Sequence, residues 1–530
     1  MEQLAGVQVS AGTAGGARRV LVFIGFMGAG KSTAARLAAE ALGVEALDSD
    51  ALLEERLGHS IAEEFQRRGE GSFRAAEEQV VCELLERAAA GSVIALGGGS
   101  VLSAKVREAL APHTTVLLDI DGETAWRRAT SKHHDPQLER PLASNREQFV
   151  ALYRERAELY GTLADAILPA TPRETLTDAL AALRALAQAP VQTKLLWASA
   201  ASGSYPVFCG QGLLQSGFWP FEPARRFAVS DLTVAQLYLQ HIKEVSAAIT
   251  IDPGERSKTL ASAQRIWSEL VSAGMTRADQ VVALGGGVVG DLAGFCAATY
   301  QRGVPIVHIP TTLVAQVDSA YGGKTGVDLP QAKNYVGAYH QPAGVLVDPG
   351  TLQTLPTAEF AAGWVEVLKT ALIAGERLWE RLAADEPIDQ QIILDCARTK
   401  LRIVAADERD GGIRQVLNLG HTVGHALEVA TGYERLRHGE AVGLGLLAAL
   451  RLSGTSKLRD QVQALLSAHN LPVSIQGIGV QEVIAALALD KKRTGTHVPF
   501  VLVHAPGDVR PGGEVDEQDL QSAINELIET

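Results

Sequence analysis

The chain has 530 residues, of which 46% are hydrophobic and 21% charged, and its formal charge is -13 at pH 7. A chain of this length is too long for a single hydrophobic core, and about three folding units are expected. The negative charge argues against a protein that coats nucleic acid or an anionic membrane. A small anionic substrate stays possible, because it needs only a local cluster of basic side chains.

The cysteines and the N-terminal residues favour a cytoplasmic protein. Cys82, Cys209, Cys296 and Cys396 lie far apart without a Cys-x-x-Cys pair, so neither a disulfide framework nor a cysteine zinc site is expected. No apolar stretch is long and charge-free enough to span a bilayer, and the N-terminus lacks the basic-then-apolar order of a signal peptide. Residues 1–17 are expected to form a flexible tail. The expected partners are small molecules rather than nucleic acid or membrane.

The first part of the chain alternates short apolar runs with amphipathic stretches, a pattern typical of a parallel α/β sheet. The runs at 20–24, 93–96 and 116–118 predict buried strands, and residues 175–188 predict a closing helix. We therefore expect an α/β domain over residues 18–188 and a short linker at 189–194.

The rest of the chain predicts an α/β part over 195–355 and a mostly helical part over 356–530. Apolar runs at 227–229, 281–284 and 306–309 predict the strands. The segment 93–99 resembles 281–287, but the flanking residues do not match, so no duplication is inferred. In both segments glycines follow a strand, where they allow the backbone to approach a ligand closely.

A phosphate-binding loop follows the first predicted strand. Residues 25–32 read Gly-Phe-Met-Gly-Ala-Gly-Lys-Ser, the order Gly-x-x-x-x-Gly-Lys-Ser between a strand and a helix. Backbone N–H groups at the helix start would hold a β-phosphate, Lys31 would reach the β- and γ-phosphate oxygens, and Ser32 would ligate magnesium. The residues expected to bind ATP here are Gly28, Ala29, Gly30, Lys31, Ser32 and Thr33.

Beyond this loop, the order and spacing of several motifs resemble shikimate kinase from residue 20 to about residue 167. The matching segments are Asp48-Ser49-Asp50, Gly69-Glu70, Phe73-Arg74, Glu77 and Gly97-Gly98-Gly99. The resemblance implies that Asp48 helps to hold magnesium and that Asp50 helps to activate the attacking hydroxyl of shikimate.

The same resemblance implies a binding site for the shikimate carboxylate. Arg74 and Arg156 would pair with it, because a planar guanidinium fits two carboxylate oxygens. Gly97, Gly98 and Gly99 would let the backbone approach the ring. Arg140 matches a lid arginine that meets ATP and the transferred phosphate. An alternative is a nucleotide-sensing module without catalysis, which the retention of Lys31, Asp50 and Arg140 disfavours.

Histidines in the helical part indicate a metal site. His421 and His425 are four residues apart and would share one face of a helix. Zinc peptidases use this spacing too, but they place a glutamate after the first histidine, where this chain has Thr422. His438 and a carboxylate from elsewhere, for which Glu366 is the best candidate, would complete a three-ligand site with an open position.

The second half resembles 3-dehydroquinate synthase from about residue 205 to the C-terminus. The matching segments are 253–258, 285–291, 310–312, 316–319, 322–324, 333–334, 407–408, 414–425 and 490–492. The resemblance implies a metal, zinc or cobalt, held by Glu366, His421 and His438. It implies NAD held by Asp231, Glu255, Lys258, Gly286, Gly287, Asp291, Thr311, Thr312, Lys333 and Thr354.

The substrate of this family is a heptulosonate phosphate, which carries a phosphate and a carboxylate. The resemblance places around it Asp318, Lys324, Asn334, Lys369, Lys400, Arg414, Asn418 and His425, all except Asn334 in catalytic roles. Lys491 or Lys492 would approach it as well, and the choice between them stays open. Arg302 matches an arginine that acts across a subunit contact, and a homodimer through this half is expected.

These features predict a bifunctional enzyme of the shikimate pathway. The predicted fold class is α/β, with a P-loop NTPase-type kinase domain fused to a two-part synthase. That synthase would combine a Rossmann-like NAD-binding domain with an α-helical metal-binding domain. An alternative for the second half is a related sugar-phosphate cyclase of secondary metabolism, which the neighbouring kinase and the retained Arg414 disfavour.

Overall fold

The computed structural model describes residues 20–131, 145–170, 173–330, 332–494 and 500–529. The chain divides into two compact units, Met1–Leu183 and Arg184–Thr530. The division falls inside helix α7 (Arg173–Leu186), earlier than the predicted domain end at residue 188. The second unit is not divided further, so the predicted boundary near residue 355 stays a prediction. The predicted tail, 1–17, lies outside the described residues.

The first unit is built on a parallel sheet in the order β2-β3-β1-β4-β5. The predicted strands at 20–24, 93–96 and 116–118 correspond to β1, β3 and β4. Val22 and Phe23 on β1 are fully buried, as expected for a strand covered on both faces. The strands are β1 (Leu21–Ile24), β2 (Ala46–Asp48), β3 (Val93–Ala95), β4 (Thr114–Asp119) and β5 (Ala166–Pro169).

Helices surround this sheet, and one of them has a sharp kink. Helix α3 bends at Gly69, whose φ of 77° and ψ of 174° lie outside the helical region and require glycine. Besides α7, the helices of this unit are α1 (Lys31–Leu42), α2 (Ser49–Leu57), α3 (Ile61–Arg87), α4 (Ala104–Leu110), α5 (Gly122–Thr130) and α6 (Arg146–Leu163).

The second unit contains a sheet in the order β6-β7-β14-β11-β10-β8-β9. Its strands are parallel except for the antiparallel pair β6–β7, and the predicted strands at 227–229, 281–284 and 306–309 correspond to β8, β10 and β11. The strands are β6 (Lys194–Ala200), β7 (Gly203–Cys209), β8 (Arg226–Asp231), β9 (Val245–Ile251), β10 (Gln280–Gly285), β11 (Ile306–Pro310) and β14 (Gly344–Val347). Helices α8 (Leu213–Ser216), α9 (Leu232–Tyr238), α10 (Leu260–Ser272) and α11 (Gly287–Thr299) accompany this sheet.

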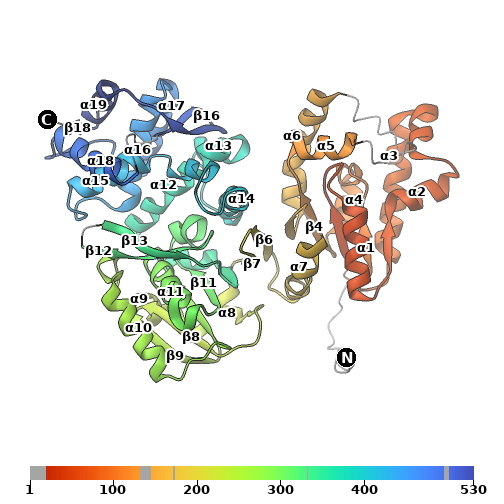
Figure 1. Cartoon of the computed structure of the whole chain (residues 1–530). Coiled ribbons are helices and arrows are strands. Elements are labelled where there is room, and N and C mark those ends of the chain that lie inside the picture. The colour runs from red at the N-terminus through yellow and green to blue at the C-terminus, as the bar shows by residue number, and fades with distance from the viewer. Residues whose placement is uncertain (1–19, 132–144, 171–172, 331, 495–499, 530) are drawn as a thin grey trace. The chain divides into compact units, whose positions relative to one another are not determined.

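A hairpin that the sequence patterns did not predict lies between β11 and β14 in the chain. Strands β12 (Lys324–Leu329) and β13 (Ala332–Tyr339) pair with each other in a separate two-stranded sheet. Figure 1 shows the helices of the C-terminal part on one side of this hairpin and strands β8, β9 and β11 on the other.

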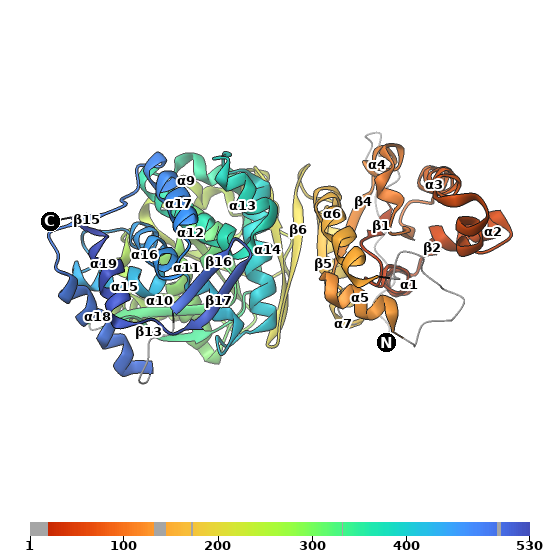
Figure 2. The same ribbon diagram turned by 90° about the horizontal axis from the view of Figure 1, so that it is seen from above.

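The C-terminal part is mostly helical, as predicted. Its helices are α12 (Thr357–Ala374), α13 (Glu376–Ala383), α14 (Gln390–Ala406), α15 (His421–Ala430), α16 (His438–Leu452), α17 (Ser456–Ala468), α18 (Val480–Thr494) and α19 (Glu517–Asn525). A further unpredicted hairpin lies among them (Figure 2), formed by β16 (Phe500–Ala505) and β17 (Asp508–Gly513). The short strands β15 (Ile475–Gln476) and β18 (Ile528–Glu529) also pair. None of the helices described is long and apolar enough to cross a membrane.

Helices α15 and α16 pack so closely that glycine is required at their contact. A Cβ atom added to Gly445 on α16 would lie 1.8 Å from the carbonyl oxygen of Gly420 and 2.9 Å from the backbone nitrogen of Gly424. Because both contacts are backbone atoms, no side-chain rotation can relieve them.

Gly445→Ala is therefore expected to destabilise the second unit by about 3 kcal/mol, because α15 and α16 must separate. Gly443→Ala on the same helix is the matched control, since its nearest neighbour is the flexible side chain of Leu466 at 3.2 Å. Calorimetric unfolding of both variants measures the difference. Equal melting temperatures for the two variants would contradict the close-packing argument.

Candidate active sites

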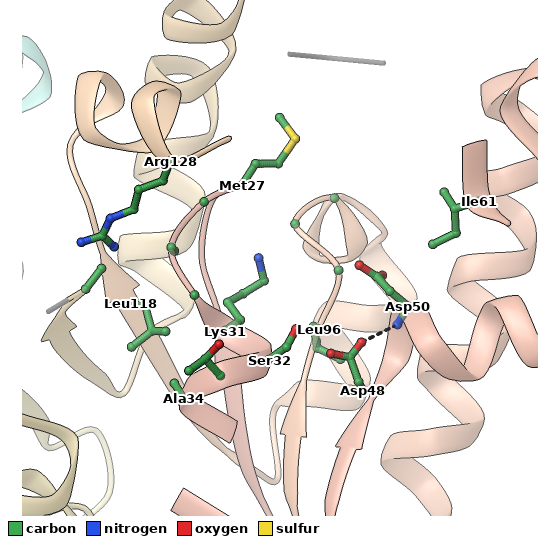
Figure 3. Close-up of a pocket in the computed structure, with 18 of the residues that line it drawn as sticks. Met27, Lys31, Ser32, Ala34, Asp48, Asp50, Ile61, Leu96, Leu118 and Arg128 are labelled. Atoms are coloured by element: carbon green, nitrogen blue, oxygen red, sulfur yellow. Dashed lines mark hydrogen bonds between the residues drawn. The ribbon is translucent and has the colours of Figure 1, made fainter. Parts of the chain in front are cut away.

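The phosphate-binding loop lies between β1 and α1 and lines a cavity of about 1030 Å³ (Figure 3). Gly28 and Gly30 have φ angles of 82° and 87°, which favour glycine. The first N–H groups of the twelve-residue helix α1 point out of its N-terminus, where they can bind an anion. All six residues predicted to bind ATP in this loop line the cavity: Gly28, Ala29, Gly30, Lys31, Ser32 and Thr33.

Two aspartates lie across this cavity from the loop (Figure 3). Asp48 ends β2 and caps α2, where its Oδ1 accepts hydrogen bonds from the backbone nitrogens of Asp50 at 3.0 Å and Ala51 at 3.4 Å. Water reaches the Asp50 side chain through the open cavity, yet the surrounding protein disfavours its charge and raises its pKa to about 6. The nearby charge of Lys31 acts in the opposite direction. Asp50 thus has a pKa suited to a general base near neutral pH.

Arginine and glycine residues complete the wall beside Asp50. Arg74 donates to Glu77, with Nη1 2.7 Å from Oε2, and Glu77 is only 3% exposed. A Cβ atom at Gly97 would lie 2.5 Å from Asp50 Oδ1, and one at Gly99 would lie 2.0 Å from Arg74 Nη1. At both positions glycine leaves room for the charged side chains, which would have to shift to accommodate a Cβ atom.

The remaining predicted residues of this site differ in their placement. Arg156 on α6 is 7% exposed and lines the cavity, and the carbonyl oxygen of Gly98 accepts a hydrogen bond from Tyr160. Arg140 lies outside the described residues. Sequence reasoning assigned no role to Arg128, which lines the cavity from the end of α5. Arg127 and Arg128 are adjacent on this helix, and no sequence motif indicates which of them faces the cavity.

A second cavity of about 1060 Å³ lies within the second unit, at the carboxyl ends of β8 and β10. The carboxyl ends of parallel strands are the usual nucleotide site of such sheets. Eight predicted NAD residues line this cavity: Asp231, Glu255, Lys258, Gly286, Gly287, Asp291, Thr312 and Lys333. Thr311 and Thr354 are not among its lining residues. Thr311 is buried behind the wall, and the hydroxyl group of Thr354 lies 2.6 Å from that of Tyr238.

The turn after β10 brings the backbone close to its surroundings. A Cβ atom at Gly286 would lie 2.8 Å from Thr312 Cγ2. Nearby, Lys258 is 4% exposed and donates to Asp291 at 2.6 Å and to the side-chain oxygen of Asn334. Burial by itself lowers the pKa of Lys258, but the carboxylates of Asp291 and Glu255 outweigh it and raise that pKa.

Three helices bring the predicted metal ligands together. Glu366 lies on α12, His421 begins α15 and His438 begins α16, and one ligand atom from each lies within 4.8 Å of the others. Glu366 Oε1 lies 3.7 Å from His421 Nε2 and 3.4 Å from His438 Nε2. The other ring nitrogen of His421 lies 3.1 Å from the carbonyl oxygen of Leu419, which leaves Nε2 to face the cluster.

The cluster fits a divalent metal. Glu366 is 1% exposed, and its Oε1 has no hydrogen-bond partner among the described residues. A buried carboxylate oxygen without a donor is unfavourable, and a cation held between it and two imidazole nitrogens would satisfy it. The donor set of one carboxylate and two histidines suits zinc or cobalt.

Buried lysines connect this cluster to Asp318. Lys369 Nζ lies 2.6 Å from Glu366 Oε2 and 3.7 Å from Asp318 Oδ2, and Lys400 pairs with the Asp318 carboxylate. Burial would raise the pKa of Asp318, but the two lysines outweigh it and lower that pKa to about 2. The result is a chain of alternating charges, three of which belong to predicted substrate residues.

The other predicted substrate residues are spread around the same region. Lys324 pairs with Asp410, and the guanidinium of Arg414 donates to the carbonyl oxygens of Gly322 at 3.1 Å and of Glu408. Asn334 and His425 line the cavity, whereas Arg414 is only 2% exposed.

Two further predicted positions are exposed, and the side chains of two others lie outside the described residues. Asn418 ends the 3-10 helix Ile413–Asn418 and is exposed, and Arg302, with φ of 70°, is exposed and does not line the cavity. Lys491 and Lys492 lie on the backbone of α18, but their side chains lie outside the described residues.

Sequence reasoning missed Glu428, which is 3% exposed and borders the second cavity. It lies seven residues after His421 and three after His425 on the same helix, so helical spacing already indicated a shared face.

Comparison with known families gives a match for each half of the chain. The family model "Shikimate kinase" matches residues 27–187. The models "3-dehydroquinate synthase N-terminal" and "3-dehydroquinate synthase C-terminal" match residues 248–362 and 363–493.

Individual relatives match the second half over almost their whole length. The 3-dehydroquinate synthase of Halorhodospira halophila is 40% identical over 350 residues, which cover 63% of this chain and 99% of that protein. That of Symbiobacterium thermophilum is 42% identical over 333 residues, covering 58% of this chain and 92% of the relative.

Solved structures give the same fold for this half. The 2-epi-5-epi-valiolone synthase of Streptomyces hygroscopicus, solved with NAD+ and Zn2+, is 26% identical with a TM-score of 0.56 and covers 62% of this chain and 98% of its own. A 2-deoxy-scyllo-inosose synthase complexed with carbaglucose-6-phosphate, NAD+ and Co2+ has a TM-score of 0.57 at 23% identity, covering 63% and 100%. The predicted fold class is thus confirmed. The chain matches curated 3-dehydroquinate synthases over nearly their full length, and it therefore belongs to the 3-dehydroquinate synthase family. It carries a shikimate kinase domain ahead of the synthase.

Proposed function

We propose that the chain is a bifunctional enzyme of the shikimate pathway. Its first unit transfers a phosphate from ATP to shikimate, giving shikimate 3-phosphate. Its second unit converts 3-deoxy-D-arabino-heptulosonate 7-phosphate to 3-dehydroquinate and phosphate. The observation that carries the second activity is the Glu366–His421–His438 cluster joined to the buried lysines beside a nucleotide-type cavity.

A related cyclase of secondary metabolism is the second candidate, because the structural neighbours include such enzymes. Identity favours the first candidate: 40% to a 3-dehydroquinate synthase against 26% to a valiolone synthase. The kinase domain in the same chain points to the same pathway.

The second cavity is the proposed site for NAD, and the three-ligand cluster the proposed site for zinc or cobalt. When bound, NAD would supply a hydride acceptor and the metal a Lewis acid. The protein's own contribution is charge and position. Lys369 and Lys400 hold Asp318 in place, and these two lysines and Lys324 are proposed to contact the anionic substrate. His425, on the cavity wall, is placed to move a proton near the metal ligands.

In the kinase unit, Lys31 and the start of α1 are proposed to hold the ATP phosphates, with Ser32 and Asp48 on magnesium. Asp50 would accept the proton of the attacking hydroxyl group. Arg74 and Arg156 would bind the carboxylate of shikimate, which then aligns the hydroxyl with ATP.

We further propose a homodimer formed through the synthase unit and a cytoplasmic location. The exposed Arg302, outside the cavity of its own chain, is available to a partner subunit, and the four cysteines are free thiols. Light scattering of the purified chain measures the assembly, and a monomer at micromolar concentration would contradict the dimer.

The substrate of the second unit is tested directly by incubating the chain with NAD, Zn2+ and the heptulosonate phosphate. We expect phosphate release with formation of 3-dehydroquinate, identified by mass spectrometry and NMR. A parallel reaction uses a heptulose phosphate without the carboxylate. Turnover of that compound alone would assign the unit to the related cyclases.

The kinase activity should decline as the pH falls below about 6, because Asp50 must be deprotonated to accept a proton and its pKa is raised to about 6. The measurement is kcat/KM for shikimate against pH. Asp50→Asn should reduce the rate by about 100-fold or more and remove this acidic limb, while ATP binding persists. The synthase activity of the same sample is the internal control. An unchanged acidic limb in Asp50→Asn would refute the role of Asp50.

Removal of the metal should separate the two activities. Dialysis against a chelator, followed by Mg2+ alone, is expected to abolish the synthase reaction and to leave the kinase reaction intact. Added Zn2+ or Co2+ should restore the synthase in the native chain but not in His421→Ala, which lacks a ligand. Full synthase turnover in Mg2+ alone would contradict the assigned metal site.

A further inference from the structure

Glu428 lies between the metal cluster and the nucleotide cavity. It is on α15, 3% exposed, and its two carboxylate oxygens face different partners. Oε2 lies 3.6 Å from His438 Nδ1, and Oε1 lies 3.2 Å from Lys333 Nζ. Because His438 turns its Nε2 toward Glu366 at 3.4 Å, its two ring nitrogens face two different carboxylates.

Glu428 faces His438 as a carboxylate does when it orients a metal-binding histidine. A histidine that binds a metal through Nε2 carries its proton on Nδ1, and a carboxylate facing that N–H fixes the ring and makes the other nitrogen a better ligand. Glu428 is the carboxylate in that position. At 3.6 Å the two atoms are within ion-pair range and just beyond hydrogen-bond distance.

Through Lys333, Glu428 also contacts a residue of the nucleotide cavity wall. Lys333 lies on β13 and lines this cavity, and its Nζ lies 4.4 Å from the centre of the Tyr433 ring. A buried carboxylate is costly unless it is paired. If oxygens of a bound nucleotide draw Lys333 toward them, His438 becomes the remaining partner of Glu428, and their contact strengthens.

From this arrangement we propose that Glu428 is a positioning residue that holds His438 for the metal and couples metal binding to NAD binding through Lys333. This inference rests on the proposed function, because it requires the metal and NAD to bind at the sites named above. Linkage requires the effect to be mutual: NAD raises the affinity for the metal, and the metal raises the affinity for NAD by the same factor.

The test measures Co2+ binding by competition with a chromophoric chelator, with and without NAD and in the absence of substrate. In the native chain we expect NAD to tighten Co2+ binding by about 5-fold or more. Glu428→Gln should weaken Co2+ binding by about 10- to 100-fold and make it independent of NAD. Glu428→Asp should recover part of both effects, and the absorption bands of bound Co2+ should keep the same ligand set in all variants.

The matched control is Glu434→Gln. Glu434 follows the C-terminal end of α15, and its exposed carboxylate pairs with the exposed Arg256. This variant should bind Co2+ as the native chain does. A merely structural role of Glu428 would lower the melting temperature without abolishing the effect of NAD on the metal.

Several outcomes would overturn the inference. The first is that Glu428→Gln binds Co2+ as tightly as the native chain does. The second is that NAD still tightens Co2+ binding in this variant. A third is complete loss of binding in Glu428→Gln while Glu366→Gln still binds, because Glu428 would then be a direct ligand with His425 and His438. Failure of the native chain to bind Co2+ or NAD at all would instead refute the proposed cofactors, so the two failures are distinguishable.

Discussion

The buried carboxylate of Glu366 is the constraint on which the second site depends. At 1% exposure it cannot be hydrated, so every neighbour that faces it must supply positive charge or a metal ligand. Lys369 comes from its own helix, whereas His421 and His438 come from the starts of two other helices. The close packing of α15 on α16, which depends on Gly445, keeps these two helix starts together.

Charge alternates outward from this carboxylate. Lys369 leads to Asp318 and then to Lys400 on one side, and His438 leads to Glu428 and then to Lys333 on the other. Each buried charge is partnered by one of opposite sign, which limits the cost of burial. The same chain of contacts connects the metal cluster to residues that face the second cavity, so the groups that limit the cost of burial include those proposed to bind the cofactors.

In the kinase unit, glycines make room for a cluster of charged side chains. Asp50 and Glu77 lie close to the backbone at Gly97, and Arg74 lies close to it at Gly99, so a Cβ at either glycine would displace them. The acidic neighbours and the surrounding protein raise the pKa of Asp50, whereas Lys31 opposes that change. Among the described residues, those that line each cavity all belong to a single unit.

Local patterns in the sequence predicted the strands that feed both glycine-rich turns, the helical character of the C-terminal part, and the motifs of both families. These features depend on neighbours within a few residues, which periodicity and motif spacing report directly. The hairpins β12–β13 and β16–β17 were missed. Half of the residues of β13 are exposed and it has no apolar run, whereas β16 begins with the apolar run 500–503, which the sequence analysis did not single out.

Tertiary structure alone decided which charges meet. The pairing of Lys333 with Glu428, of Lys324 with Asp410 and of Arg414 with backbone carbonyls joins residues separated by many positions in the chain. Burial then sets the strength and the direction of each interaction, as the raised pKa of Asp50 and the lowered pKa of Asp318 show. The sequence by itself determined which chemical groups are available and the families to which they belong. Only the packing of distant segments decided which groups are neighbours and how far water is excluded from them.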